Sequence, residues 1–281
     1  MDLSDRAVWL LLAAIIVILV LYVRLMRKNR RLRQLAAEAN RLRHEAAEEQ
    51  RRNRQLKQEM TSNIAHELKT PVSSIRGYLE ILLGDHAPID EERRRHYLER
   101  SYSQTLRLSD LIQDVSLINK LEESSDLFPK EHVDVQAIAQ EAIDELSDRA
   151  AAAAISIDNR LPKPMPLNGS RELIYAVFRN LVENSVEHAG EGCRIGIETY
   201  SPTSPHHTYY IHFYDTGHGV PDADLTRLFD RFVRIDDGRS RRNGGTGLGL
   251  SIVKHAVLFH GGEIYARNRA EGGLEFFISF S

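Results

Sequence analysis

Residues 1–70 contain neither glycine nor proline, so no strong helix breaker occurs before Pro71. From residue 24 to residue 70, most positions carry good helix formers, namely leucine, alanine, arginine, glutamate, glutamine and lysine. This composition predicts one uninterrupted helix. A helix of that length without caps is typical of membrane spans and coiled coils rather than of a globular core.

The start of this helix has the character of a membrane span. Residues 7–23, AVWLLLAAIIVILVLYV, are uncharged and apolar, about the shortest run that crosses a bilayer as a helix. Six basic residues follow it, which are Arg24, Arg27, Lys28, Arg30, Arg31 and Arg33. By the positive-inside rule, we expect residues 1–26 to form a single-pass anchor in the inner (cytoplasmic) membrane, with the rest of the chain in the cytoplasm. A cleaved signal peptide is the alternative, but it requires a basic N-terminal region and a small-residue cleavage site.

Residues 27–59 carry a heptad pattern. Steps of three and four join Leu32, Leu35, Ala39, Leu42, Ala46, Glu49, Asn53, Leu56 and Met60. This seam predicts a parallel coiled-coil homodimer. Glu49 and Asn53 are polar seam residues and should make the middle of the coil its weakest section. A solvated single helix is the alternative, because many of the side chains are charged.

Residues 60–122 predict a helical hairpin. The apolar stripe shifts phase after Met60 and continues through Ile64, Leu68, Ile75, Leu79 and Leu82. The segment GDHAPID, residues 84–90, should end the first helix, and Pro71 should bend or loosen it. A second helix is expected from about residue 91 to 121, with one apolar side made of Leu98, Tyr102, Thr105, Leu108, Ile112, Val115 and Ile118. Two hairpins paired in a dimer would form a four-helix bundle.

His66 lies in AHELKTP, where it could be a metal ligand, a core residue or a reactive group. A zinc-protease helix requires a second histidine four residues later, and position 70 is Thr. The apolar stripe passes through Ile64 and Leu68, each two positions away and therefore about 200° around the helix. We therefore expect His66 to point away from the buried stripe, as a surface group available for chemistry.

Residues 127–281 have a mixed pattern. We expect helices at about 134–150, 170–189 and 247–259, and strands at 154–159, 194–200, 208–214, 262–267 and 274–280. Antiparallel strands with helices on one face would form an α/β sandwich. The whole chain is therefore predicted to be of the α+β class.

Three clusters in this second region indicate an anionic ligand. Asn180 and Asn184 lie four residues apart on one helical face, and DTGHGVP, residues 215–221, ends a strand with an acid and two glycines. The segment GGTGLGLSIVK, residues 244–254, runs from glycines directly into a helix, whose N-terminus favours phosphate. A Walker loop is excluded because Leu250 and Ser251 follow its last glycine. A Rossmann fingerprint is excluded because no strand directly precedes Gly244.

These clusters, behind the His66 hairpin, resemble the bacterial sensor histidine kinases of two-component signalling. The resemblance covers about residues 55–281 and rests on five motifs in the family's order. They are an H box from His66 to Pro71, an N box from Asn180 to Asn184, a glycine box from Asp215 to Gly219, an F box LFDRFVRID at 228–236, and a second glycine box from Gly245 to Gly249. The second region is similar to the gyrase and mismatch-repair (MutL-like) ATPases, which lack an H-box hairpin.

The resemblance implies a protein-histidine kinase. His66 would take the γ-phosphoryl group of ATP, Glu67 would orient its ring and accept its proton, and Thr70 would place water for dephosphorylation of the partner. The partner would be a response regulator, which receives the phosphoryl group on an aspartate.

The resemblance also assigns the residues of an ATP site. Asn184 would bind Mg²⁺, supported by Asn180, and Asp215 would accept a hydrogen bond from adenine. Residues 220–246 would form a lid next to Gly217 and Gly219, with Arg231 as one candidate for a phosphate contact. The phosphates would approach the backbone of Gly245, Thr246, Gly247, Leu248 and Gly249.

One residue departs from the family's pattern. N boxes often carry Lys or Arg three residues after the Mg²⁺-binding Asn, and this chain has Glu187 there. A carboxylate would repel phosphate unless it points away, so another cation, such as Arg231, would have to substitute. This departure predicts slower or weaker use of ATP.

The remaining features limit the alternatives. The net charge of −3 argues against direct nucleic-acid binding, and the single Cys193 fits a reducing compartment. A phosphatase-biased or kinase-dead regulator would share the architecture, and Glu187 is its best support. A membrane tether with a coiled coil would explain residues 1–60 but none of the motifs.

Overall fold

The computed structural model describes residues 3–84, 89–123, 125–202, 206–235 and 245–281. Within these ranges, the side chains of residues 3–18, 20, 29–37, 39–40, 53, 56 and 125 are not described. The chain divides into two compact units, residues 1–62 and residues 63–281.

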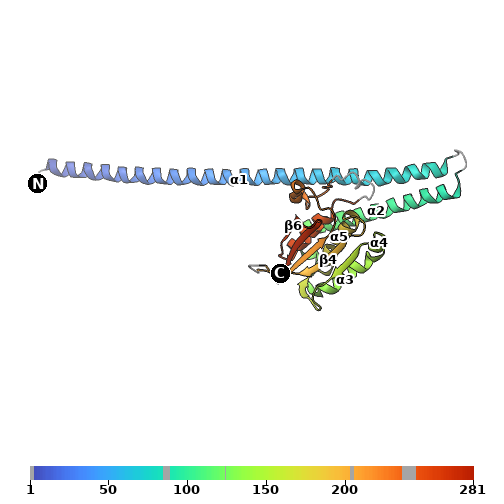
Figure 1. The fold of residues 1–281 in the computed structure, drawn as a ribbon. Coiled ribbons are helices and arrows are strands. Elements are labelled where there is room, and N and C mark those ends of the chain that lie inside the picture. The colour runs from blue at the N-terminus through green and yellow to red at the C-terminus, as the bar shows by residue number, and fades with distance from the viewer. Residues whose placement is uncertain (1–2, 85–88, 124, 203–205, 236–244) are drawn as a thin grey trace. The chain divides into compact units, whose positions relative to one another are not determined.

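The predicted long helix is confirmed as α1, Leu3–Leu83, which continues across Pro71 (Figure 1). The predicted membrane span, residues 7–23, lies largely outside the described side chains, which include only 19 and 21–23 of it. Among the described residues, no helix holds a segment that is long and apolar enough to cross a bilayer. In the predicted coiled coil, the seam residues Leu42 and Ala46 are both exposed in the single chain.

The second unit begins with a helical hairpin. The end of α1 lies against α2, Glu91–Glu123, as the break at residues 84–90 predicts. Tyr78 and Tyr97 stack between the two helices, with ring centroids 5.8 Å apart. Leu111 and Ile118 are the buried apolar residues of α2, whereas Leu98, Tyr102 and Ile112 of the predicted stripe are exposed. The helix itself was predicted correctly, and of its predicted apolar stripe only Ile118 is buried in the single chain.

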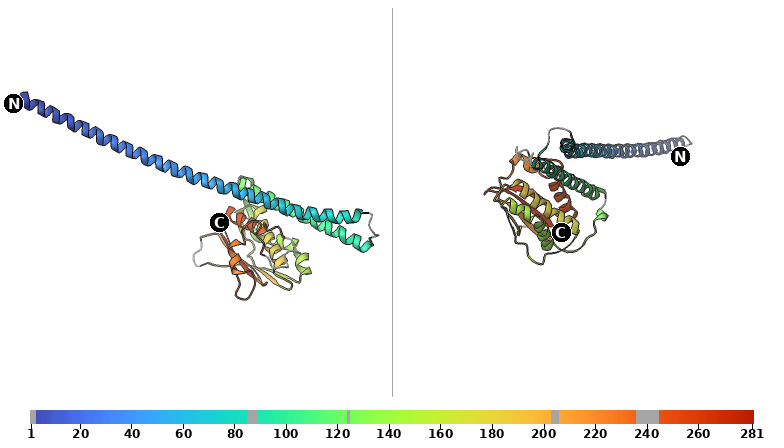
Figure 2. Two further views of the ribbon diagram at one scale, coloured as in Figure 1. Left: turned by 90° about the horizontal axis from the view of Figure 1, so that it is seen from above. Right: turned by 90° about the vertical axis from the view of Figure 1, so that its right-hand side faces the viewer.

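The remainder of the second unit is an α/β sandwich, which confirms the α+β class (Figure 2). The main sheet has the strand order β2-β4-β5-β7-β6. These strands are β2 Ser156–Asn159, β4 Arg194–Thr199, β5 Tyr209–Asp215, β6 Ile264–Asn268 and β7 Leu274–Phe280. The pair β2–β4 is parallel and the other pairs are antiparallel, which corrects the expectation of an entirely antiparallel sheet.

Short elements were missed by the sequence patterns. Strands β1, Glu131–Asp134, and β3, Pro166–Gly169, pair antiparallel in a separate two-stranded sheet. The predicted helix at 134–150 is interrupted at Leu146, which separates α3, Val135–Glu145, from α4, Ser147–Ala152. Among the described residues, 3₁₀ turns occur at Ser125–Leu127 and Asp222–Arg227.

Helices cover one face of the main sheet. They are α3, α5, Arg171–His188, and α7, Gly249–Phe259 (Figures 1 and 2). Apolar side chains on this face, including Phe213 and Phe276 of the sheet and Val177 and Leu181 of α5, are fully buried. Burying each such side chain contributes about 1.5–3 kcal/mol to folding. This core fixes α5 and the start of α7 on the sheet.

The opposite face of the sheet carries a layer of aromatic side chains. Phe277 stacks between His212 and Tyr265, with centroid distances of 4.7 and 4.8 Å. The His212 ring also contacts two carboxylates, Glu275 Oε2 at 2.8 Å and Glu198 Oε1 at 3.3 Å. Ring stacking and hydrogen bonds to carboxylates therefore stabilise the side chains on the face that the helices leave uncovered.

Candidate functional site

His66 lies on the surface of α1, with 81% of its side chain exposed, as the phase of the apolar stripe predicts. Its Nδ1 is 3.8 Å from Glu67 Oε1, which is attractive but longer than a hydrogen bond. The other carboxylate oxygen of Glu67 is 3.5 Å from Arg107 Nη2 of α2. Glu67 is thus held between the imidazole and a guanidinium. Arg107 was not predicted, because its contact with Glu67 joins residues on two different helices.

Thr70 lies one helical turn after His66. Its Oγ1 donates a hydrogen bond to the His66 carbonyl oxygen at 3.3 Å. The hydroxyl oxygen is exposed and keeps its capacity to accept a hydrogen bond. The three H-box residues predicted to act together are therefore neighbours on one exposed stretch of α1.

The N-box residues lie on α5, which begins at the N-cap Ser170. Asn180 is buried, and its Nδ2 donates to the Ala176 carbonyl at 2.8 Å. Its Oδ1 faces the start of α7, where a Cβ added to Gly249 would be only 2.6 Å away. A glycine at 249 is therefore required for α7 to begin this close to Asn180.

Asn184 lies one turn further along α5 and is half-buried. Within the described part of the chain, its side-chain amide has no hydrogen-bond partner, so its oxygen can accept a ligand. An amide oxygen is a ligand that Mg²⁺ accepts, and this ion needs few protein ligands when phosphate and water supply the others. No cluster of three or more His, Cys, Asp or Glu side chains suited to a metal occurs among the described residues. Asn184 fits such a cation only together with a phosphate ligand.

Asp215 ends β5 with a buried carboxylate. Its Oδ1 accepts from the backbone N–H of Gly217 at 2.9 Å and of Leu274 at 3.2 Å. Its Oδ2 lies 3.3 Å from the Ser185 hydroxyl, which donates to it. Ser185 was not predicted, although it lies on α5 directly after Asn184. The carboxylate is therefore held in one orientation by three donors.

The first glycine box packs tightly after Asp215. A Cβ on Gly217 would lie 2.5 Å from the Ala189 carbonyl oxygen, and one on Gly219 would lie 2.5 Å from Asn268 Oδ1. Asn268 also accepts from the Val220 N–H at 2.9 Å and donates to the Val220 carbonyl at 2.7 Å. Asn268 of β6 thus fixes the turn that leads into the predicted lid, most of whose second half, residues 236–244, lies outside the described residues.

The second glycine box leads into α7. Gly247 has a φ of +70°, a conformation that favours glycine, and its carbonyl accepts from the Phe232 N–H at 2.8 Å. Thr246 Oγ1 donates to Asp114 Oδ2 of α2 at 2.8 Å and accepts from the Leu248 N–H at 3.2 Å. Leu248 is fully buried, and the start of α7 carries no side-chain cap. Since no side chain of the described residues caps this first turn, its N–H groups can bind an anion.

Arg231 contacts the hairpin. Its Nη1 is 2.5 Å from Glu122 Oε1 near the end of α2, and its Nη2 is 3.2 Å from His255 Nε2. Arg231 therefore forms an ion pair with α2 in this structure, and its contact with phosphate stays a prediction. This ion pair and the Thr246–Asp114 hydrogen bond join two residues of the predicted lid to α2 of the hairpin.

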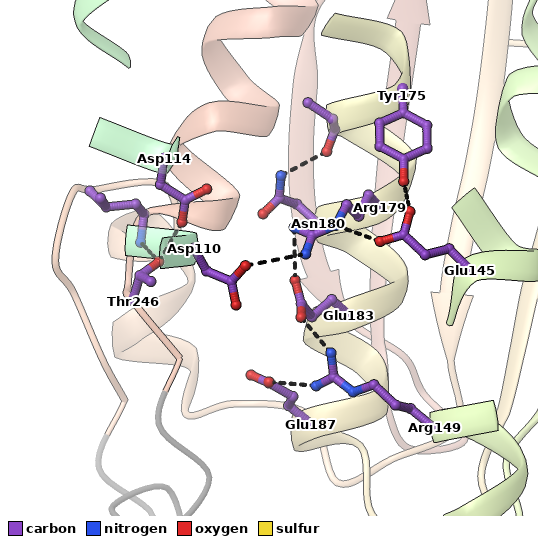
Figure 3. Close-up of polar contacts among 12 residues, drawn as sticks. Asp110, Asp114, Glu145, Arg149, Tyr175, Arg179, Asn180, Glu183, Glu187 and Thr246 are labelled. Atoms are coloured by element: carbon purple, nitrogen blue, oxygen red, sulfur yellow. Dashed lines mark hydrogen bonds and ion pairs between the residues drawn. The ribbon is translucent and has the colours of Figure 1, made fainter. Parts of the chain in front are cut away.

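A network of carboxylates and guanidiniums lines the neighbouring face of α5 (Figure 3). Arg179 contacts Glu183 Oε2 at 3.3 Å and Asp110 Oδ1 at 3.9 Å. Arg149 of α4 contacts both Glu183 and Glu187. Burial, followed by the charge of Glu183, raises the pKa of Glu187 above its ordinary value. The sequence patterns did not predict the contact of Arg149 with Glu187.

The Asp114–Thr246 contact should respond to pH. Burial is the largest cause that raises the pKa of Asp114, to about 6, and the nearby carboxylates Glu183 and Asp110 add to it, whereas Thr246 and Arg179 lower it. We call the state in which Thr246 of the second glycine box is bound to Asp114 of α2 the docked state. An exposed Asp114 would titrate near 4, so the docked state binds more protons than the undocked state between about pH 4 and pH 6. Docking should therefore weaken as pH rises through this window.

This dependence can be measured by hydrogen exchange of the amides of residues 245–250, corrected for the intrinsic effect of pH. We expect stronger protection at pH 5 than at pH 7 in the wild type. Asp114→Asn should show equal protection at both, because its amide does not titrate but still accepts from Thr246. An unchanged pH difference in the variant would assign the effect to another group.

Two protein-family models match the chain. The first contains the H box and the second contains the N box and the glycine boxes. Residues 56–124 match the His Kinase A (phospho-acceptor) domain. Residues 169–281 match the histidine kinase-, DNA gyrase B- and HSP90-like ATPase. The chain belongs to the histidine kinase family. Its two matched segments contain His66 and the Asn180–Gly249 clusters, respectively.

Relatives with similar sequences are also named as histidine kinases. The sensor-like histidine kinase SenX3 of Mycolicibacterium smegmatis is 32% identical over 223 residues, which are 79% of this chain and 57% of the relative. The sensor histidine kinase WalK of Bacillus subtilis is 30% identical over 220 residues, 78% of this chain and 35% of the relative. The chain thus spans between about a third and three-fifths of these relatives' lengths.

Solved structures share the fold of this histidine kinase. The Acinetobacter baumannii histidine kinase AdeS matches with a TM-score of 0.59 and 22% identity, over 76% of this chain and 97% of that one. The histidine kinase ThkA, in complex with the response regulator protein TrrA, matches with a TM-score of 0.61 and 22% identity. That match covers 79% of this chain and 60% of ThkA.

Proposed function

We propose that this chain is a sensor histidine kinase, which transfers the γ-phosphoryl group of ATP to His66. The observation that carries the proposal is an exposed imidazole with an anchored carboxylate beside it, on a hairpin that matches the phospho-acceptor domain. The ATPase-type domain that follows supplies a phosphoryl donor.

His66 acts as the nucleophile. The lone pair of one ring nitrogen attacks the γ-phosphorus, the bond from that phosphorus to the β,γ-bridging oxygen breaks, and ADP leaves. The ring then carries an extra positive charge. Nδ1 faces Glu67, so this carboxylate can accept the Nδ1 proton when Nε2 takes the phosphoryl group. Arg107 acts as a positioning residue that holds Glu67 in place.

ATP binds in the second part of the chain in this proposal. The carboxylate of Asp215 recognises the adenine amino group, and the backbone from Gly245 to Gly249 with the start of α7 holds the phosphates. Asn184 would hold Mg²⁺, which would neutralise charge on the transferring group. Asn180 supports this arrangement by packing against Gly249.

The phosphoryl group then passes to an aspartate of a separate response regulator. ThkA, whose fold this chain shares, has been solved with such a regulator. Thr70, one turn from His66, has an exposed hydroxyl that can place water for the reverse, dephosphorylating reaction.

We also propose that the chain acts as a homodimer. Apolar side chains are exposed along the α1 arm of the hairpin, with Leu83 83% exposed. Val72, Ile75, Leu79 and Leu83, together with Arg76 and Glu80, line a groove there. The groove can pair with a second hairpin to form a four-helix bundle, and the heptads at 27–59 can continue this pairing.

The N-terminal run at 7–23 supports a membrane location. We propose that it anchors the chain in the inner membrane by a single span, with residues 27–281 in the cytoplasm. Fluorescence of a reporter fused to either end, in cells, tests this topology: a C-terminal reporter should lie in the cytoplasm.

Labelling with nucleotide tests the proposed activity. The chain, incubated with Mg²⁺, should take up label from γ-labelled ATP but not from α-labelled ATP. A phosphatase-biased or kinase-dead regulator is the second candidate, which Glu187 favours because it places a carboxylate beside Gly245. That candidate predicts bound ATP without label, and loss of phosphate from a phosphorylated regulator.

A further inference from the structure

Two glutamates line α5 close to the second glycine box. Glu183 and Glu187 lie one turn apart, with Asn184 directly after the first of them. A Cβ on Gly245 would lie 3.3 Å from Glu187 Oε2, so this carboxylate faces the glycine box directly. A nucleotide with its phosphates between Asn184 and Gly245 would therefore meet negative charge on this wall of its site.

Arg149 of α4 contacts both glutamates with one guanidinium. Its Nη1 is 2.6 Å from Glu183 Oε1, and its Nη2 is 2.9 Å from Glu187 Oε1 (Figure 3). The two glutamate side chains are only 21% and 18% exposed, so solvent screens these pairs less than ordinary surface pairs. The planar fork of an arginine suits two carboxylates one helical turn apart.

The other guanidinium of the network cannot take over this role. Arg179 is shared among Glu183, Glu145 and Asp110, at 3.3, 3.4 and 3.9 Å. Among the described residues, Arg179 forms no ion pair with Glu187, whose ion-pair partners there are Arg149 and the neighbouring His188. Removing Arg149 would therefore leave Glu187, the carboxylate nearest the glycine box, without a permanent positive charge in contact with it.

We propose that Arg149 is a charge-compensating residue of the nucleotide site. By binding Glu183 and Glu187 together, it lowers the repulsion between this acidic wall and the phosphates of ATP. The inference rests on the proposed function, since it requires that ATP binds beside Asn184 and Gly245. It identifies a role for a residue on α4, outside all the motifs of the sequence.

The affinity of the whole chain for ATP, ADP and AMP with Mg²⁺ tests this role, measured by titration calorimetry. Arg149→Ala should weaken ATP binding about tenfold, because the uncompensated carboxylate would repel the phosphates while solvent screens part of this repulsion. The loss should be smaller for ADP and slight for AMP, because the repulsion scales with phosphate charge. Arg149→Lys should retain much of the affinity.

A second substitution separates charge from structure. Glu187→Gln in the Arg149→Ala background should restore most of the lost ATP affinity, because it removes the uncompensated carboxylate. Arg171→Ala is a matched control, since Arg171 also pairs with a glutamate, Glu141, but lies at the opposite end of α5. It should leave all three affinities unchanged.

The outcomes distinguish the inference from the proposed function. Wild-type protein that binds ATP, with Arg149→Ala equal to it, would overturn the inference alone. An equal loss for ATP, ADP and AMP, or no recovery with Glu187→Gln, would also overturn it, because both indicate a structural role. A wild type that binds no ATP would overturn both.

Discussion

His66→Gln is expected to reduce phosphoryl incorporation from γ-labelled ATP to background, a loss of at least about a thousandfold. Glutamine is neutral and of similar size, but its amide nitrogen has no lone pair comparable to that of imidazole. Because His66 is 81% exposed, the substitution should not disturb packing. ATP affinity should therefore remain at the wild-type value, and the measurement is label retained on the protein beside that affinity.

His96→Gln is the matched control for this prediction. His96 is also an exposed histidine of the hairpin, on α2, and its ring contacts the ring of Tyr97. Its substitution should leave labelling unchanged. Full labelling of the His66 variant would contradict the assignment of the nucleophile, as would equal loss in both variants.

Asp215→Asn is expected to weaken ATP binding about a hundredfold, or by about 3 kcal/mol, and to remove the preference for ATP over GTP. The wild-type carboxylate accepts from Gly217, Leu274 and Ser185, and an amide replaces one acceptor oxygen by a donor. The orientation that presents an oxygen to adenine is then lost. Calorimetric titration with ATP and GTP measures both effects.

Stability has to be followed in the same variant, because Asp215 is buried. Asp222→Asn is the control: Asp222 begins the 3₁₀ turn Asp222–Arg227, is exposed, and accepts a hydrogen bond from Asn268 Nδ2 at 2.7 Å. It should retain ATP affinity. A folded Asp215→Asn protein with unchanged preference for ATP would show that adenine is recognised elsewhere.

The sequence was most informative where local pattern determines structure. The absence of glycine and proline before Pro71 predicted α1, and α5 and β7 were predicted within a residue of their observed bounds. Helix propensity and alternating burial act over a few residues, so they can be read from the chain directly.

Features that depend on distant partners could not be predicted in this way. The parallel pairing of β2 with β4 depends on how the chain returns to the sheet, and β1 and β3 are too short to show a pattern. On α2, the exposed Leu98, Tyr102 and Ile112 have the same helical spacing as a buried stripe. Sequence periodicity cannot separate a face buried within one chain from a face that is available to a second one.

The residues of the candidate site show the same difference between local and distant features. Its motif residues were found from the sequence, whereas the residues that hold them came from the structure. Arg107 contacts Glu67 forty positions away, and Arg149 contacts Glu187 from a separate helix. Charged side chains such as these are common on any surface, so only their placement distinguishes them.

Mapping of the phosphorylated residue tests the central claim most directly. After reaction with Mg-ATP at neutral pH, the wild-type chain is digested under alkaline conditions and the modified peptide is sequenced by mass spectrometry. We predict one phosphoryl group on His66, lost on mild acid treatment and retained in alkali, because the phosphorus–nitrogen bond is acid-labile. An acid-stable phosphate, or a modified peptide that lacks His66, would contradict the account.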